Sequence, residues 1–192
     1  MRPGDTVPDF AFLRPDGSRG QLSEFCTADF LLLVFLRHLA CAACNAHLGE
    51  VDAARERFAA RGCPVLVVSQ AKPKILTLYT SRKVWGVPLV GDPDRAVYTV
   101  FGLERAGRLA FFKPLVLWRF FRAMTKGYLA ARPYAGEDQR QLGGDFIITR
   151  ERKLVFAYRS IDPTDRPSVA ALLATLPASP TAGERTPATA NG

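Results

Sequence analysis

The chain has 192 residues, of which 48% are hydrophobic, and it carries a formal net charge of +8 and four cysteines. This length and apolar content predict one globular domain with a substantial core, and so few cysteines exclude a disulfide scaffold. The first residues lack the apolar stretch of a signal peptide, and no window offers the roughly 18 apolar residues of a membrane span. We therefore expect a cytoplasmic protein.

The positive charge is concentrated in one segment. Seven Arg or Lys residues lie between Arg105 and Arg132, and no Asp or Glu interrupts them. A basic patch is one requirement of nucleic-acid binding, but no recognised nucleic-acid motif accompanies this one. Nucleic acid is therefore not an expected partner.

The first third of the chain reads as strands followed by a helix. A short strand is predicted at residues 9–13, and a turn and a second short strand follow before Leu22. The unbroken apolar run at 30–36 predicts a central strand that is covered on both faces. From residues 41 to 60, apolar side chains recur at spacings of three and four, which predicts a helix that ends at Gly62.

The remainder alternates strands and helices before it ends in a hairpin and a last helix. The predicted strands cover residues 64–69, 88–91, 145–149 and 154–158. One predicted helix begins at Pro73, a second covers residues 96–101, and a third covers residues 166–176. Residues 177–192 are rich in Ala, Pro and Thr with no apolar period, which predicts a disordered tail.

An additional helix is predicted within an insertion at about 104–141. After Pro114, Leu117, Phe121 and Met124 fall on one narrow stripe, and basic side chains lie opposite, so residues 115–131 read as a basic amphipathic helix. The stripe has three interpretations. Burial against the core or a partner subunit is favoured, because most apolar stripes are buried in protein. An anionic membrane surface and a wall over the cysteine site are the alternatives.

The most informative motif is Cys41-Ala-Ala-Cys44, directly after the predicted central strand. A helix that begins near Cys41 places this sulfur at a positively polarised helix end, which favours thiolate over thiol. Cys44 lies one turn further on the same face, within reach of a disulfide. Zinc requires four ligands and no second pair is evident, so we predict redox chemistry with no metal and no bound cofactor. Cys26 and Cys63 read as packed hydrophobes.

Four segments resemble the peroxiredoxin-like branch of the thioredoxin superfamily, and more narrowly the AhpC/TSA relatives that carry Cys-x-x-Cys. They cover residues 4–10, 35–44, 91–102 and 143–148. The resemblance implies an α/β domain of the thioredoxin-like fold over residues 1–176. It implies a central mixed β-sheet flanked by helices, with a short N-terminal β extension and the inserted amphipathic helix.

The resemblance gives two alignments of the cysteine pair. On the peroxiredoxin pattern Pro-x-x-x-Thr-x-x-Cys, Cys44 takes the peroxidatic place, Cys41 the Thr place and Arg37 the Pro place. On the thioredoxin pattern, Cys41 attacks and Cys44 resolves. We favour Cys41, because the first sulfur of such a pair is usually the exposed one and because Arg37 and His38 could add positive charge nearby.

The sequence also departs from both patterns. Cys41 replaces the Thr of a peroxidase, Gly143-Gly144 replaces the Arg that often precedes the late strand, and the cis-proline of thioredoxins is absent. Neither strong peroxidase activity nor strong generic thioredoxin activity is therefore expected. Gly143 and Gly144 are expected to let the backbone approach the cysteines closely.

The resulting expectation is an antioxidant thiol–disulfide oxidoreductase that cycles Cys41 and Cys44 between dithiol and disulfide, with peroxide reduction as a further activity. The alternatives are a one-thiol peroxidase centred on Cys44 and a non-catalytic interaction module that uses the basic helix at 115–131. Expected partners are an oxidised thiol or peroxide and a cellular dithiol reductant of the thioredoxin or glutathione type. A homodimer is left open, and a membrane surface is not favoured.

Overall fold

The strand β3 (Phe30–Phe35) lies at the centre of the sheet and is apolar because both of its faces are covered. In this computed structural model, residues 1–107, 110–111, 113–128 and 132–177 are described. Leu32 and Val34 point into one apolar layer, and Leu31, Leu33 and Phe35 point into the other. The period of two along the strand therefore divides one run of sequence between two cores.

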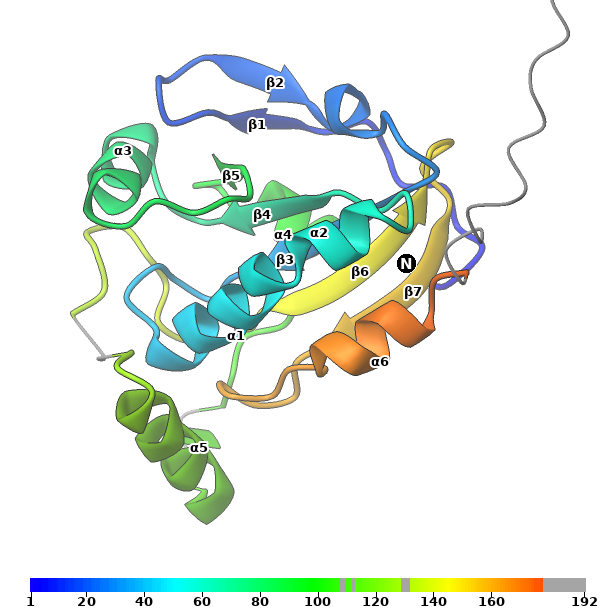
Figure 1. Cartoon of the computed structure of the whole chain (residues 1–192). Coiled ribbons are helices and arrows are strands. Elements are labelled where there is room, and N and C mark those ends of the chain that lie inside the picture. Colours follow the sequence, from blue (N-terminus) through cyan, green and yellow to red (C-terminus); the bar gives the residue numbers. More distant parts are fainter. Residues whose placement is uncertain (108–109, 112, 129–131, 178–192) are drawn as a thin grey trace, which may run out of the picture.

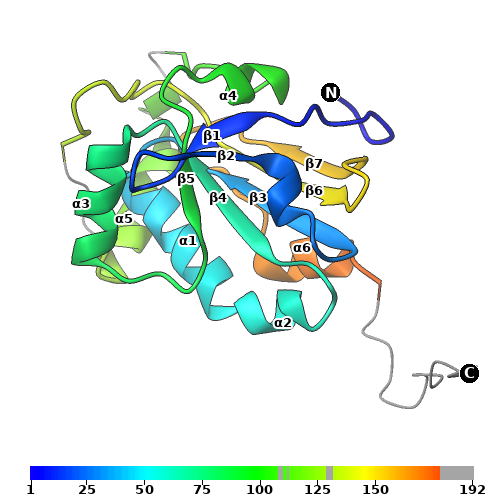
Figure 2. The ribbon, with the colours of Figure 1, turned by 90° about the horizontal axis from the view of Figure 1, so that it is seen from above.

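The sheet has seven strands in the order β2-β1-β5-β4-β3-β6-β7 (Figures 1 and 2). The strands β3, β4 and β5 are parallel, and every other pairing is antiparallel. Around β3 the remaining strands are β1 (Ala11–Leu13), β2 (Arg19–Gln21), β4 (Val65–Ser69), β5 (Leu89–Gly91), β6 (Gly144–Thr149) and β7 (Leu154–Arg159).

Helices cover both faces of this mixed sheet. One layer contains side chains of α1 (Ala42–Ala53), α2 (Arg55–Ala59), α3 (Pro73–Arg82) and α6 (Val169–Ala174). The other layer contains α4 (Ala96–Val100), the N-terminal segment and the short 3-10 helix η1 (Leu22–Phe25). This is the thioredoxin-like fold with a short N-terminal β extension, as the resemblance implied.

The helix α5 (Pro114–Thr125) stands apart from the sheet and packs against α1 (Figure 1). Val116 and Ala123 are its buried residues. The predicted stripe faces away from the body, because Leu117, Phe121 and Met124 are 54%, 66% and 45% exposed. The prediction that this stripe is buried against the domain's own core is therefore wrong within the described chain, and its burial against a partner subunit stays a prediction.

Three predicted helix boundaries are also wrong, each for a local reason. The helix expected over 41–60 is interrupted at Ala54, whose ψ of 5° leaves the helical region and separates α1 from α2. The last helix begins after Ser168, whose hydroxyl caps the amide of Ala171, because Pro167 disfavours helical backbone at Arg166. The amphipathic helix ends at Thr125, before Gly127 with its φ of 83°. Residues 129–131 and the predicted tail at 178–192 lie outside the described residues.

We predict that Phe101→Ala lowers the free energy of unfolding by about 3–5 kcal/mol, because it leaves a cavity in a tightly packed layer. Phe101 is fully buried and its ring lies 4.9 Å from that of Phe35 and 4.6 Å from that of Phe146. Urea denaturation measures the change. Val84→Ala is the control, since Val84 is 88% exposed. Equal stability of both variants would contradict the assignment of this core.

Candidate redox site

Cys41 occupies the N-cap of α1, in the turn that follows the central strand. Its backbone is extended, with φ of −79° and ψ of 115°, and its amide donates to the His38 carbonyl at 3.2 Å. The Cys41 sulfur accepts two hydrogen bonds, from Arg37 Nη1 at 3.2 Å and from the Cys44 amide at 3.4 Å. Both donors favour a negative charge on this sulfur.

Cys44 lies one helical turn inward, and both cysteines are free thiols. The Cys44 sulfur is 3.7 Å from Arg166 Nη2. Cys41 is 2% exposed and Cys44 is 1% exposed, so the expectation that the first sulfur is the exposed one is wrong. The reason is that Phe111 and Phe120 of the insertion lie over the Cys41 turn.

The two thiols titrate as a pair. Burial by itself raises the pKa of Cys44, but the hydrogen bond from Cys41 and the positive charges of Arg166 and Arg37 outweigh it, so this pKa lies well below its usual value. The hydrogen bond to Cys44 and burial place the pKa of Cys41 well above its usual value. These opposite directions favour Cys44 over Cys41 as the location of a negative charge on the pair.

Arg37 is buried and holds the Cys41 turn in place. Besides Cys41, its guanidinium donates to the carbonyls of Gln141 at 3.2 Å, Gln139 at 2.6 Å and Pro163 at 3.4 Å. It also lies 5.2 Å from the ring centre of Phe111. One side chain that follows β3 thereby fixes two later segments of the chain beside the cysteines.

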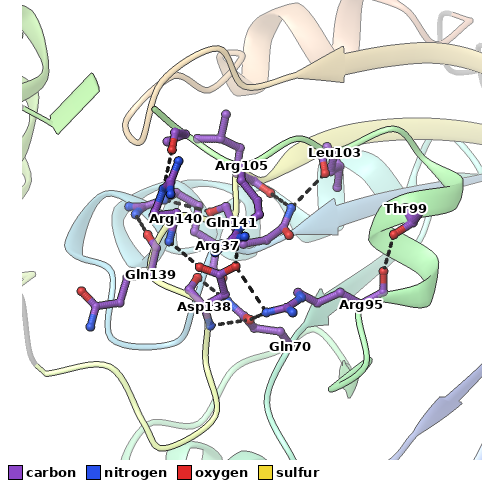
Figure 3. A network of polar contacts seen from close by, with 12 residues as sticks. Arg37, Gln70, Arg95, Thr99, Leu103, Arg105, Asp138, Gln139, Arg140 and Gln141 are labelled. Carbon is purple, nitrogen blue, oxygen red and sulfur yellow. Dashed lines mark hydrogen bonds and ion pairs between the residues drawn. The ribbon is translucent and has the colours of Figure 1, made fainter. Parts of the chain in front are cut away.

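Figure 3 shows how the segment at 137–141 is anchored in this position. Gln70 donates to the carbonyls of Arg37 and Asp138, and its Oε1 accepts the Asp138 amide at 2.7 Å. The Asp138 carboxylate lies 2.7 Å from Arg105 Nε and 3.5 Å from Arg95 Nη1. The network ties both ends of the insertion to the end of β4.

A second polar chain, which sequence reasoning did not identify, runs behind Cys44. Arg166 donates to Asp145 Oδ2 at 3.1 Å and to the Phe35 carbonyl at 2.7 Å, and His47 Nε2 lies 2.7 Å from Asp145 Oδ1. Burial raises the pKa of Asp145, but His47 and Arg166 outweigh this effect and bring it below its usual range. The signal in the sequence was Asp145 itself, a carboxylate in an otherwise apolar strand.

Gly143 and Gly144 lie where close approach requires them. A Cβ on Gly143 would overlap the Phe35 carbonyl oxygen and the Arg166 guanidinium, and one on Gly144 would lie 2.6 Å from the Tyr158 carbonyl oxygen. Gly143 therefore leaves room for the Arg166 guanidinium, which reaches Cys44. Arg166, from a later loop, thus places a positive charge beside Gly143-Gly144, the position where the family pattern has an arginine and this sequence does not.

His38 lies beside the pair but does not supply the positive charge that the sequence suggested. Burial lowers its pKa to about 4, so the imidazole is neutral at pH 7. Its Nδ1 is buried without a hydrogen-bond partner among the described residues. Cys63 is also inert, because burial raises its pKa to about 12. In the described part of the chain, no three His, Cys, Asp or Glu side chains are grouped to hold a metal.

A pocket of about 190 Å³ lies over Cys41 and gives the pair its contact with the exterior. Its polar residues include Arg37, His38 and Cys41, and Phe111, Phe120 and Pro133 form an apolar wall. Cys44 does not line it. Of the two cysteines of the pair, Cys41 is therefore the one that lies next to this pocket.

A thioredoxin-like sheet whose central strand leads to two coupled cysteines at a helix N-terminus defines a thiol-dependent oxidoreductase. The AhpC/TSA family model matches residues 3–156, and the chain belongs to this family of enzymes. No match to a curated protein was found by sequence. Among the helices of the described residues, none is long and apolar enough to cross a membrane.

Solved structures share the fold at low sequence identity. Peroxidoxin BcpB from Mycobacterium tuberculosis superposes with a TM-score of 0.62 at 18% identity, over 91% of this chain and 96% of its own. A yeast mitochondrial 1-Cys peroxiredoxin superposes with a TM-score of 0.64 at 12% identity, over 90% of this chain and 73% of its own. A putative thiol:disulfide interchange protein DsbE from Chlorobium tepidum gives 0.60 at 18% identity, over 92% and 99%.

We predict that Arg166→Gln raises the pKa of Cys44, because the variant removes a buried positive charge beside the thiolate. The pH dependence of the ultraviolet absorbance of thiolate measures this change, and its first midpoint should move to higher pH. Arg61→Gln is the matched control, since Arg61 donates to the Leu173 carbonyl instead. An unchanged midpoint in Arg166→Gln would show that Arg166 does not stabilise the charge.

Asp145→Asn is predicted to lower the free energy of unfolding by about 3–5 kcal/mol at pH 7, because it leaves Arg166 buried without its carboxylate. The folded-state pKa of Asp145 is depressed. The contribution of the Asp145 carboxylate to the free energy of unfolding is therefore complete above its pKa in the unfolded chain, about 3.9, and is lost as pH falls through its pKa in the folded protein.

The difference between wild type and Asp145→Asn should accordingly narrow below about pH 4, as measured by urea denaturation across pH. Asp94→Asn is the control, because Asp94 is exposed. A difference that stays constant down to acid pH would contradict a charged Asp145.

Proposed function

We propose that this enzyme reduces an oxidised substrate at Cys41 and closes a Cys41–Cys44 disulfide, which a dithiol donor then reopens. The observation that carries the proposal is the position of the Cys41 sulfur. It lines the pocket and accepts hydrogen bonds from Arg37 at 3.2 Å and from the Cys44 amide at 3.4 Å. These two donors stabilise a thiolate on Cys41 once it forms, although burial and the hydrogen bond to Cys44 keep the pKa of Cys41 above its usual value at rest.

The lower pKa of Cys44 is compatible with attack by Cys41. The two sulfurs share one proton, so its transfer from Cys41 to Cys44 moves the negative charge to the sulfur in the pocket. Arg37 already points at Cys41 and Arg166 at Cys44, so each location of the charge has a cation beside it. The charge can therefore reach the pocket by proton transfer alone.

With a hydroperoxide, the Cys41 thiolate attacks the terminal oxygen and the O–O bond breaks. Cys41 becomes a sulfenic acid, and the leaving alkoxide takes a proton to become an alcohol. The Cys44 sulfur then attacks Cys41, which forms the disulfide and releases water. With a disulfide substrate, the same thiolate displaces a thiol and Cys44 resolves the mixed disulfide. Each cycle consumes two electrons, which the dithiol donor supplies.

A donor of the glutathione or thioredoxin type fits this cycle. The yeast mitochondrial 1-Cys peroxiredoxin is described as resolved through glutathione and thioredoxin systems, and the Chlorobium protein as a putative thiol:disulfide interchange protein. Both share the fold of this chain. A dithiol donor of either type would attack the Cys41–Cys44 disulfide and leave with its own disulfide.

The second candidate is a one-thiol peroxidase in which Cys44 attacks the peroxide. The observation in its favour is the depressed pKa of Cys44, with Arg166 at 3.7 Å from its sulfur. In this case Cys41 acts as hydrogen-bond donor to the thiolate. The two candidates differ in which substitution removes the reaction.

We predict that Cys41→Ser loses the rapid reaction with hydrogen peroxide, whereas Cys44→Ser retains it and accumulates a sulfenic acid on Cys41. Stopped-flow fluorescence measures the reaction, and trapping with dimedone followed by mass spectrometry locates the sulfenic acid. Wild type should lose two hydrogen atoms on mild oxidation and show a Cys41–Cys44 bridge.

Cys63→Ser is the matched control and should react as wild type does, because burial raises the Cys63 pKa to about 12. Rapid oxidation of Cys41→Ser together with loss in Cys44→Ser would assign the attack to Cys44. Rapid oxidation of both variants would contradict both candidates.

A further inference from the structure

The helix α5 exposes an apolar face that nothing in the described chain covers. Five large apolar side chains on this one helix are between 45% and 66% exposed: Leu115, Leu117, Trp118, Phe121 and Met124. At about 100° per residue, the last four fall within one third of the helix circumference. Val116 and Ala123, on the other side, pack toward the body. The helix is therefore already anchored, and its most apolar face remains free.

Two positive charges lie near this face. Arg122 is next to the stripe on the helix and Lys113 precedes the helix, whereas Arg119 and Lys126 lie on the side opposite the stripe. Lys126 pairs with Glu50 at 2.7 Å, and Arg119 lies 3.7 Å from Asp162. Within the described residues, neither Lys113 nor Arg122 has an acidic partner.

The surrounding sequence adds no negative charge, because no Asp or Glu occurs between Arg105 and Gly136. Lys113 and Arg122, which have no acidic partner among the described residues, therefore present positive charge beside exposed aromatic and aliphatic side chains. Among surfaces that a protein meets, an anionic bilayer offers both complements at once: negative headgroups for the cations and acyl chains for the stripe.

We propose that α5 docks the enzyme on the surface of an anionic membrane. The helix lies in the plane of the interface, with Leu117, Trp118 and Phe121 inserted among the lipids and Arg122 at the headgroups. The prior anchoring of α5 on α1 favours this mode, because the helix need not fold on binding.

A second copy of this chain fits the face less well. Pairing two stripes would bring their basic borders together, and like charges oppose each other most strongly at an interface from which water is excluded. The segment offers no carboxylate to relieve that repulsion. Dimerisation through the stripe is therefore the competing outcome in the test.

Docking would also bring the cysteine pocket close to the lipid. Phe120 of α5 lines the pocket over Cys41, so the pocket lies within about one helix diameter, roughly 10–12 Å, of the docked surface. This consequence rests on the proposed function, but the docking itself does not. Cys41→Ser should bind vesicles as wild type does, so failure of one proposal can be told from failure of the other.

Co-sedimentation with vesicles tests the proposal. Wild type should bind vesicles of phosphatidylcholine with phosphatidylglycerol at least tenfold more strongly than vesicles of phosphatidylcholine alone. Phe121→Asp should weaken binding to the anionic vesicles by about tenfold or more, and Arg122→Glu by about tenfold. Equal affinity for both kinds of vesicle, or no binding by wild type, would overturn the proposal.

Matched controls place the same changes elsewhere on the surface. Val155→Asp alters an exposed apolar residue on β7, and Arg57→Glu reverses an exposed charge on α2. Both should bind as wild type does. A loss of binding equal to that of the α5 variants would overturn the assignment to α5. A wild-type dimer that Phe121→Asp converts to monomer, without vesicle binding, would assign the stripe to a second copy.

A fluorescence measurement avoids any dependence on the folding of the charge variants. The chain has two tryptophans, Trp85 and Trp118, so Trp85→Phe leaves a single reporter on the exposed face of α5. Its emission should shift to the blue with anionic vesicles and be quenched by a lipid-attached quencher. Unchanged emission would overturn the proposal.

Discussion

The site depends on two arginines that are buried on either side of the cysteine pair. A guanidinium removed from water requires partners for its charge and its donors. Arg166 has the carboxylate of Asp145, whereas Arg37 has carbonyls and, among the described residues, no carboxylate. Among the contacts of the Arg37 guanidinium in the described chain, the Cys41 sulfur at 3.2 Å is the group that can carry a negative charge. A thiolate in the pair therefore offsets part of the cost of burying the two guanidinium groups, and these groups in turn stabilise the thiolate.

The same arginine explains why the insertion closes the site. Arg37 donates to the carbonyls of Gln139 and Gln141, and the Gln70–Asp138 contacts hold that segment at the end of β4. Phe111 and Phe120 then cover the Cys41 turn, and α5 is held on α1 with its apolar stripe outward. The pocket beside Cys41 and the exposed stripe thus arise from one insertion whose two ends are tied to the end of β4.

Local sequence patterns predicted most helices and strands, because the formation of a helix or strand depends mainly on residues that are close in the sequence. The apolar run at 30–36, the cysteine motif and the hairpin at 145–158 could each be recognised from spacing alone. The contacts of Arg166 with Cys44 and of His47 with Asp145 join residues 122 and 98 positions apart. They depend on the register that places Phe35 opposite Gly144, which no local pattern specifies. Packing of the α5 stripe on the domain's own core was wrongly predicted, because a buried face and an exposed face of a helix have the same period.

The burial of Cys41 changes what its place at the helix N-cap means. In an exposed pair, the first sulfur would hold the charge continuously, and any passing oxidant could react with it. Here the opposite pKa directions favour the negative charge on Cys44, which does not line the pocket, and the proton on Cys41, which does line it. In the proposed cycle, Arg37 and the Cys44 amide already point at Cys41, so proton transfer from Cys41 to Cys44 leaves the donors of the Cys41 sulfur in place. The proposed cycle thus separates the cysteine that the pKa directions favour as thiolate from the cysteine that lines the pocket.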